Sequence, residues 1–197
     1  MHTVIENACE NISLITEPSI DILSKLWCSR LSIPDEIRYA FADASPGFEQ
    51  FVEGVDKGEI LCALTENENG ELVAASWLHD FERDPEGEPR VAWVGAYVFP
   101  GHRGAAAVAS SRLVLQYYED IGIQHIHTAI HIDNRKSQLF TRSRSMMAFT
   151  FVCQYPEWTT FGGEPADALI FTQHAHDKML AWMCARKLAS QRLLSQE

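Results

Sequence analysis

The stretch of sequence that decides the fold is Val94–Ala107, which reads VGAYVFPGHRGAAA. Its first half is continuously apolar and rich in Val and aromatic residues, which is typical of a strand buried on both faces. Pro100 ends this strand, and the alanines from Ala105 onward predict that a helix begins just after Gly104. The stretch therefore predicts a buried strand, a short turn and a helix.

A turn of this kind is suited to holding a phosphate group. The first N–H groups of a helix have no partner within the helix and point toward an approaching anion. Glycine and alanine leave room for phosphate oxygens to reach the backbone, and Arg103 or His102 adds positive charge. We therefore expect a diphosphate site at Pro100–Gly104. An ordinary strand-to-helix connection of another α/β protein is the alternative.

Upstream of this turn, hydrophobic spacing and turn residues predict a strand, helices, a hairpin and the strand that leads into the turn. The first strand covers 11–16. Three helices follow: one at 19–31, one that begins at Pro34 and one at 48–55. The hairpin strands cover 59–65 and 72–81, on either side of the Asn-Gly turn at 67–70. A polar loop at 82–89 precedes the strand 90–99.

Downstream, the helix 105–121 ends at Gly122, as a helix C-terminus commonly does. The following elements are a strand at 124–132, a helix at 134–147, strands at 150–155 and 168–174, and a final helix at 178–194. A strand–helix–strand unit after a hairpin predicts an α/β fold of the α+β type, with a mixed sheet and helices on both faces. We expect one domain, 1–177, extended by the C-terminal helix in 178–197.

Composition excludes some classes of function. The chain has 197 residues and a formal net charge of −11, which argues against a general nucleic-acid binder and is compatible with a cationic substrate. The five cysteines show no metal-binding spacing, and the N-terminus lacks a signal-peptide pattern. With no long apolar run, we expect a cytoplasmic protein that does not span a membrane.

The turn resembles the coenzyme A signature of the GNAT superfamily of N-acetyltransferases, V-x-P-x-x-R-G-x-G-x-G/A. Four residues match in position: Val98, Pro100, Arg103 and Gly104. Ala106 and Val108 replace the later glycines. The order of elements from Asn11 to His174 also resembles that family.

The resemblance implies a GNAT-like acyltransferase fold that uses acetyl-CoA as acyl donor, with its pantetheine arm between the strand 90–99 and a splayed partner strand, 124–132. It implies the following cofactor-binding residues: Val98, Phe99, His102, Arg103, Gly104, Ala105, Ala106 and Asn134. Asn134 begins the family's second motif, in which Ser137 is an acceptable small residue. Thr141 stands where the family commonly has a tyrosine that donates a proton to the departing thiolate.

The expected chemistry requires a base, because the amine must lose a proton as it attacks the thioester. The strand 90–99 carries no carboxylate, so the nearest candidates are His79, Asp80 and Glu82 at the end of the preceding strand, which a solvated strand end explains equally well. Our catalytic candidates are His79, Glu82, His131 and Thr141.

Three histidines, His125, His127 and His131, fall on one face of the strand 124–132. Two histidines one residue apart can bind zinc, but no Cys, Asp or Glu shares this face, so we expect no metal. His131 would take part in proton transfer, or the three histidines would simply pack under a helix or at the sheet edge.

Two further segments have several interpretations. The segment 158–163, with Trp158, reads as a loop that shapes an acceptor pocket or simply packs. The helix 178–194 is basic and amphipathic, so it would dock on the domain, form a homodimer contact or touch a membrane.

The sequence thus predicts an N-acetyltransferase that moves an acetyl group from acetyl-CoA to a primary amine of a small molecule or a protein. The alternative is a non-catalytic protein of the same fold with a structural or assembly role, since some phage-associated proteins also resemble this family.

Overall fold

The computed structural model describes residues 3–7, 10–32, 47–143, 147–161 and 164–174. The predicted helix after Pro34 and the predicted final helix 178–194 lie outside these residues, and the proposed division at residue 177 therefore stays a prediction.

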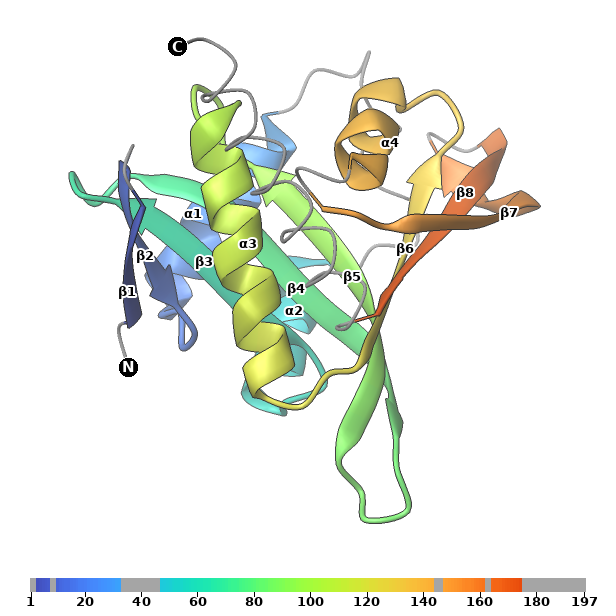
Figure 1. Ribbon diagram of the computed structural model, residues 1–197, viewed down its shortest axis with the longest axis horizontal. Coiled ribbons are helices and arrows are strands. Elements are labelled where there is room, and N and C mark those ends of the chain that lie inside the picture. The colour runs from blue at the N-terminus through green and yellow to red at the C-terminus, as the bar shows by residue number, and fades with distance from the viewer. Residues whose placement is uncertain (1–2, 8–9, 33–46, 144–146, 162–163, 175–197) are drawn as a thin grey trace, which may run out of the picture.

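Eight strands form one sheet in the spatial order β1-β2-β3-β4-β5-β6-β8-β7 (Figure 1). Their bounds are β1 Thr3–Asn7, β2 Glu10–Ile15, β3 Leu61–Asn67, β4 Leu72–Arg83, β5 Pro89–Val98, β6 His125–His131, β7 Thr150–Phe161 and β8 Glu164–His174. Neighbouring strands run antiparallel except β5 and β6, which are parallel. The predicted mixed sheet is confirmed.

Four helices flank the described sheet: α1 Ile20–Leu31, α2 Phe48–Asp56, α3 Ala105–Asp120 and α4 Arg135–Arg142. Figure 1 shows α3 crossing one face of the sheet, with α1 and α2 behind the other. The prediction of helices on both faces is therefore confirmed. Within the described ranges, no helix combines the length and the apolar character needed to cross a membrane.

The core between α3 and the sheet is continuous from β2 to β8. Val114 and Tyr118 of α3 pack there with Ala92, Ile126 and Phe171 from the strands. A buried polar pair is satisfied within this layer, because the Thr65 hydroxyl donates to Ser110 Oγ at 2.9 Å. This packing fixes the position of α3 over the strands, and with it the position of the turn that precedes the helix.

A second core lies between α1, α2 and the opposite face. It buries Leu23, Phe51, Leu64 and Phe99. The Tyr97 hydroxyl adds a polar tie from β5 to the end of α1, since it shares a hydrogen bond of 2.9 Å with Ser29 Oγ. Tyr97 therefore faces α1 and α2. Because side chains alternate along a strand, the other odd-numbered residues of β5 lie on the same face of the sheet.

Several element bounds differ from the predictions. β1 was not predicted, and α4 covers 135–142 rather than 134–147, because the backbone leaves the helical region at Ser143 (ψ 120°) and turns left-handed at Ala148 (φ 55°). β7 and β8 are longer than predicted, so Trp158 lies in a strand and not in a loop. Pro156 lies inside β7, which tolerates a proline because it is an edge strand.

Gly95 of β5 lies directly under the Trp77 ring of β4, and this position has no room for a side chain. The two residues are partners in the β4–β5 ladder, and a Cβ on Gly95 would lie 2.3 Å from Trp77 Cε2. Trp77 in turn packs edge-on against Phe51 of α2, with ring centroids 6.0 Å apart. The absence of a side chain at Gly95 therefore lets Trp77 fill the space between the sheet and α2.

We predict that Gly95→Ala destabilises the protein by about 1–3 kcal/mol, because Trp77 must leave its packed position. Chemical denaturation measures this change in the free energy of unfolding. In a Trp77→Phe background the same substitution should cost clearly less, because the smaller ring removes the clash. Equal stability of Gly95→Ala and the parent protein would contradict this account.

Candidate functional site

β5 and β6 pair over a short distance and then separate. Their parallel ladder contains three residue pairs, Val91–His125, Ala92–Ile126 and Trp93–His127. Beyond these pairs, β5 continues along β4 as far as Val98, and β6 continues along β8 as far as His131. Figure 1 shows the two strands parting from this point. Their facing edges are therefore not hydrogen-bonded to each other past Trp93 and His127.

The register identifies which backbone groups of β5 face this opening. The N–H of Phe99 donates to the Val73 carbonyl of β4, and the Arg90 carbonyl accepts the N–H of Gln124 on the β6 side. Because backbone groups alternate between the two edges of a strand, Val94, Ala96 and Val98 turn their N–H and C=O groups toward β6. The Val94 N–H closes the ladder at the Trp93–His127 pair, so the Val94 carbonyl and both groups of Ala96 and Val98 face the opening.

This alternation supports one predicted backbone contact and corrects another. Val98 presents its N–H and C=O to the opening, as expected. Phe99 does not: its N–H is bonded to Val73, its carbonyl accepts the N–H of His102 at 3.2 Å, and its side chain is buried against α1 and α2. The position of Phe99 one residue beyond the open edge explains the error.

The turn after β5 is shaped by two glycines with left-handed backbones, Gly101 (φ 90°) and Gly104 (φ 87°). A Cβ built on either would meet no atom within 4 Å, so the turn is open on its outer side. Gly104 is the N-cap of α3 without any side-chain hydrogen bond, and no acidic residue lies in the first helical turn. The first amides of α3 therefore have neither a capping side chain nor a repelling carboxylate.

This helix start has the properties of an anion site. The first intrahelical bond that reaches back to the cap joins the Val108 N–H to the Gly104 carbonyl at 3.1 Å, so the amides of Ala105, Ala106 and Ala107 precede it and stay outside the helical ladder. Arg103 is exposed beside them. Together with the positive end of the α3 dipole, these groups are suited to a diphosphate.

The comparisons with known proteins bear on this arrangement. No family model and no curated protein matches the sequence. Solved structures do match: RimJ of Mycobacterium smegmatis, solved with CoA-disulfide, has a TM-score of 0.69 at 13% identity, covering 89% of this chain and 88% of its own. The ribosomal L7/L12 α-N-protein acetyltransferase RimL has a TM-score of 0.66 at 14% identity, covering 88% and 95%. The yncA acetyltransferase of Salmonella typhimurium, solved with acetyl-CoA, has a TM-score of 0.61 at 13% identity, covering 83% and 93%.

The chain shares the fold of these solved structures. At these identities the similarity establishes the fold, and the predicted resemblance is confirmed at that level. The parted strands and the uncapped helix start coincide with the segments on which the sequence resemblance placed the coenzyme A signature.

We call the end of the opening at which β5 and β6 are still paired, by Trp93 and His127, the closed end. His79 lies beside it. It is the β4 partner of Trp93, which in turn is the β5 partner of His127. The backbone of Asp80 is left-handed (φ 51°) within an irregular part of the ladder, and its carboxylate lies 2.8 Å from His79 Nδ1. This bulge holds a histidine–carboxylate pair next to the last residue pair that joins β5 and β6.

The other three catalytic candidates lie elsewhere. Glu82 pairs with Val91, further toward the hairpin tip, and is exposed. His131 is at the far end of β6, where its Nδ1 accepts the N–H of Asp133 at 3.0 Å. Thr141 is buried, so it does not replace an exposed tyrosine hydroxyl. The structure thus brings only His79 of the four to the closed end.

Asn134 acts as the N-cap of α4, because its side-chain oxygen accepts the N–H of Ser137 at 3.2 Å. Its predicted contact with the acyl donor stays a prediction. His125 packs its ring against His174, with centroids 4.0 Å apart, and burial together with the charges of His174 and His127 lowers the pKa of His125. Among the residues that the structure describes, no group of three or more His, Cys, Asp or Glu side chains is arranged to bind a metal.

Sequence reasoning named Trp158 as part of a possible acceptor pocket, but it missed Trp93 and the contact between the two residues. Trp93 contacts His127 at 5.5 Å and Trp158 at 5.3 Å between ring centroids. In the sequence, Trp93 is one of several apolar residues of a predicted strand. No neighbouring residue indicates that it contacts Trp158 in β7. Only the pairing of distant strands reveals this juxtaposition.

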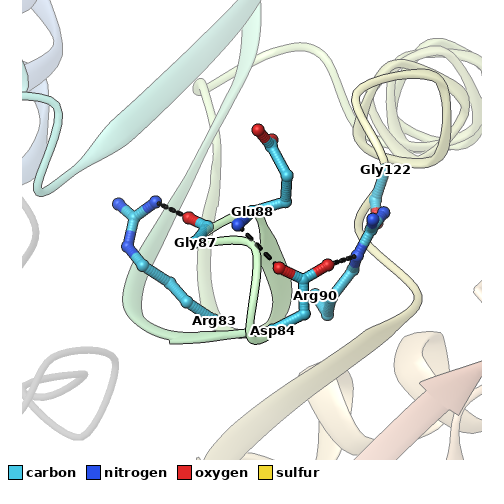
Figure 2. A network of polar contacts seen from close by, with 6 residues as sticks. All are labelled: Arg83, Asp84, Gly87, Glu88, Arg90 and Gly122. Carbon is cyan, nitrogen blue, oxygen red and sulfur yellow. Dashed lines mark hydrogen bonds and ion pairs between the residues drawn. The ribbon is translucent and has the colours of Figure 1, made fainter.

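The closed end is held by a polar network around Arg90 (Figure 2). Arg90 Nε donates to Asp84 Oδ2 at 2.7 Å, and its Nη1 donates to the Gly122 carbonyl at 3.4 Å. The second Asp84 oxygen accepts the N–H of Glu88 at 2.9 Å within the β4–β5 turn. The network therefore connects the β4–β5 hairpin to the segment that enters β6.

The Arg90–Asp84 pair predicts a pH dependence of stability. The hydrogen bond from Arg90 is the largest cause that holds the pKa of Asp84 below its ordinary value. Because the pKa is lower in the folded state, this contribution is present above pH about 4 and is lost as the pH falls through the folded-state pKa. We expect Asp84→Asn to lower the melting temperature at pH 7, and the difference from the parent protein to shrink below pH about 4.

Thermal denaturation followed by circular dichroism between pH 7 and pH 3 measures this difference. Exposed Asp56→Asn at the end of α2, which has no hydrogen bond to Arg90, is the matched control. A difference for Asp84→Asn that stays constant over the whole range would contradict the role of the ion pair.

Proposed function

We propose that this protein is an N-acetyltransferase that moves the acetyl group of acetyl-CoA to a primary amine. The observation that carries the proposal is the combination of parted β5 and β6 with the uncapped start of α3 at the end of β5. Proteins of this fold solved with CoA-disulfide or acetyl-CoA support the same donor.

In this proposal each end of the opening holds a different part of the donor. The diphosphate binds the amides of Ala105 and Ala106, with Arg103 adding a positive charge. The pantetheine arm hydrogen-bonds to the groups of β5 that face the opening, from Val98 inward. The thioester then lies between Ala96 and the closed end, where the Ala96 N–H faces the opening and is available to stabilise the negative charge that develops on the carbonyl oxygen.

The reaction is a direct transfer. The amine nitrogen attacks the thioester carbon, the C–N bond forms, the C–S bond breaks, and coenzyme A leaves as a thiolate that takes a proton from water. His79 accepts the proton that the amine loses, directly or through a water molecule, and Asp80 holds the imidazole with Nε2 available for this transfer.

Acetyl-CoA binding tests the donor site. We expect Arg103→Ala to raise the dissociation constant of acetyl-CoA about tenfold to a hundredfold, because a charge-assisted bond to phosphate is lost. Isothermal titration calorimetry measures the constant, and Lys57→Ala, which removes an exposed cation from α2, serves as the matched control. Absence of any acetyl-CoA binding by the parent protein would favour a non-catalytic, structural role for this fold.

His79 is tested by activity. We expect His79→Ala to lower kcat by a factor of about 10² to 10⁴, with unchanged affinity for acetyl-CoA, because general-base catalysis is lost and the donor site is intact. The release of free coenzyme A thiol is the measurement. His131→Ala provides the comparison: a large loss of kcat there, together with an active His79→Ala, would show that the base was assigned to the wrong histidine.

Small amines and protein N-termini are the two acceptor classes that an activity panel distinguishes. RimL and the ribosomal-protein-S5-alanine acetyltransferase of Vibrio fischeri carry protein acceptors in their names. A peptide with a free N-terminal alanine therefore belongs in the acceptor panel beside small amines.

A further inference from the structure

Four rings from three strands meet on the sheet face that α1 and α2 partly cover. Trp93 of β5 lies against His127 of β6 and against Trp158 of β7, and Tyr155 packs edge-on against Trp158 with centroids 5.1 Å apart. Trp93 and Trp158 are tilted by 31°, which is close to a stacked arrangement. We call Trp93, His127, Tyr155 and Trp158 the aromatic cluster.

A bulge in β7 brings Trp158 into this cluster. The β7–β8 register passes from Tyr155–Ala168 to Thr159–Ala166, so that three residues of β7 lie opposite one of β8. The Asp167 carboxylate braces the bulge, since one oxygen accepts the N–H of Glu157 at 3.1 Å and the other accepts the Gln154 side-chain amide at 2.6 Å. Glu157 adopts a left-handed backbone (φ 48°) within it. Bulges commonly re-aim a side chain beside a functional site.

The aromatic cluster lies where the proposed chemistry would take place, and this step rests on the proposed function. Trp93 and His127 form the last pair before β5 and β6 part. From Val98 to Trp93 an extended strand covers about 17 Å, which is comparable with an extended pantetheine arm. A donor bound with its diphosphate at α3 therefore brings its thioester close to Trp93.

The rings remain accessible. Tyr155 is 52% exposed and Trp158 is 39% exposed, whereas Phe171 of the neighbouring strand is fully buried. Large aromatic side chains that stay exposed beside a site mark a surface for an apolar partner. On the other side of Trp93, the His79–Asp80 pair supplies a polar, acidic end. The face thus offers an aromatic surface and a carboxylate on opposite sides of one tryptophan.

We infer that the acceptor is a primary amine joined by a short chain to an aromatic ring. Its ring packs on Trp158 and Tyr155, and its ammonium group lies toward His79 and Asp80, where it loses a proton. Ring stacking favours such a molecule over an unbranched amine, because aromatic pairs gain free energy beyond the area they bury. The β7 bulge then determines acceptor specificity, and the α3 turn determines donor binding.

The test compares phenethylamine with hexylamine, spermidine and the alanyl peptide as acceptors, at saturating acetyl-CoA. We expect phenethylamine to have the highest kcat/KM, at least about tenfold above hexylamine. Trp158→Ala should raise the KM for phenethylamine about tenfold and leave kcat, the KM for hexylamine and the acetyl-CoA affinity nearly unchanged. Phe151→Ala, another exposed ring on β7, is the matched control and should change none of these values.

A second measurement does not depend on turnover. Phenethylamine is titrated by calorimetry into the protein saturated with coenzyme A, and into Trp158→Ala treated in the same way, with melting temperatures confirming that both are folded. Binding that Trp158→Ala weakens supports the inference. No binding of phenethylamine to the coenzyme-loaded protein, or preference for spermidine or the peptide regardless of Trp158, overturns it while leaving acetyl transfer intact. Failure to bind acetyl-CoA at all overturns the proposed function itself.

Discussion

The site depends on one constraint, which is that β5 and β6 have different partners along most of their length. β5 is bonded to β4 as far as Val98, and β6 is bonded to β8 as far as His131, so the two strands stay together only over three pairs. Buried backbone groups require partners, and β5 past Trp93 has them on only one edge. The Arg90 network joins the β4–β5 hairpin to the segment that enters β6, next to the end at which the two strands are paired.

The two ends of this opening have different chemistry because different elements border them. At the open end, α3 starts with small residues and no cap, and its packing through Val114 and Tyr118 fixes those amides in space. At the closed end, side chains of β4, β6 and β7 surround Trp93. Two of the three left-handed residues other than glycine in the described chain, Asp80 and Glu157, lie in bulges that border this end. Irregular backbone thus accompanies the residues proposed to act on the acceptor.

The similarity to known structures establishes the fold, and the local geometry identifies the opening and the helix start at which we propose that the donor binds. At identities of 13% and 14% the backbone arrangement is shared, whereas most side chains differ from those of the solved structures. Here Thr141 is buried and the strand before the turn carries no carboxylate, so neither supplies the proton-transfer group of the proposed reaction. The His79–Asp80 pair at the closed end is the group that we propose for this role.

The sequence by itself determined the local elements: the buried strand, the glycine turn, the start of α3 and the hairpin at Asn67–Gly70, because their signals lie within a few neighbouring residues. It also predicted the turn that we propose as the donor site, but it could not show that the Phe99 N–H points to β4, because the edge to which a backbone group points depends on strand pairing. Only the tertiary structure decided that Trp93, His127 and Trp158 meet, since β5, β6 and β7 are distant in the chain and β8, the last of the eight strands in sequence, lies between β6 and β7 in the sheet. Local propensity carries no information about such register, which is set by long-range strand pairing and packing.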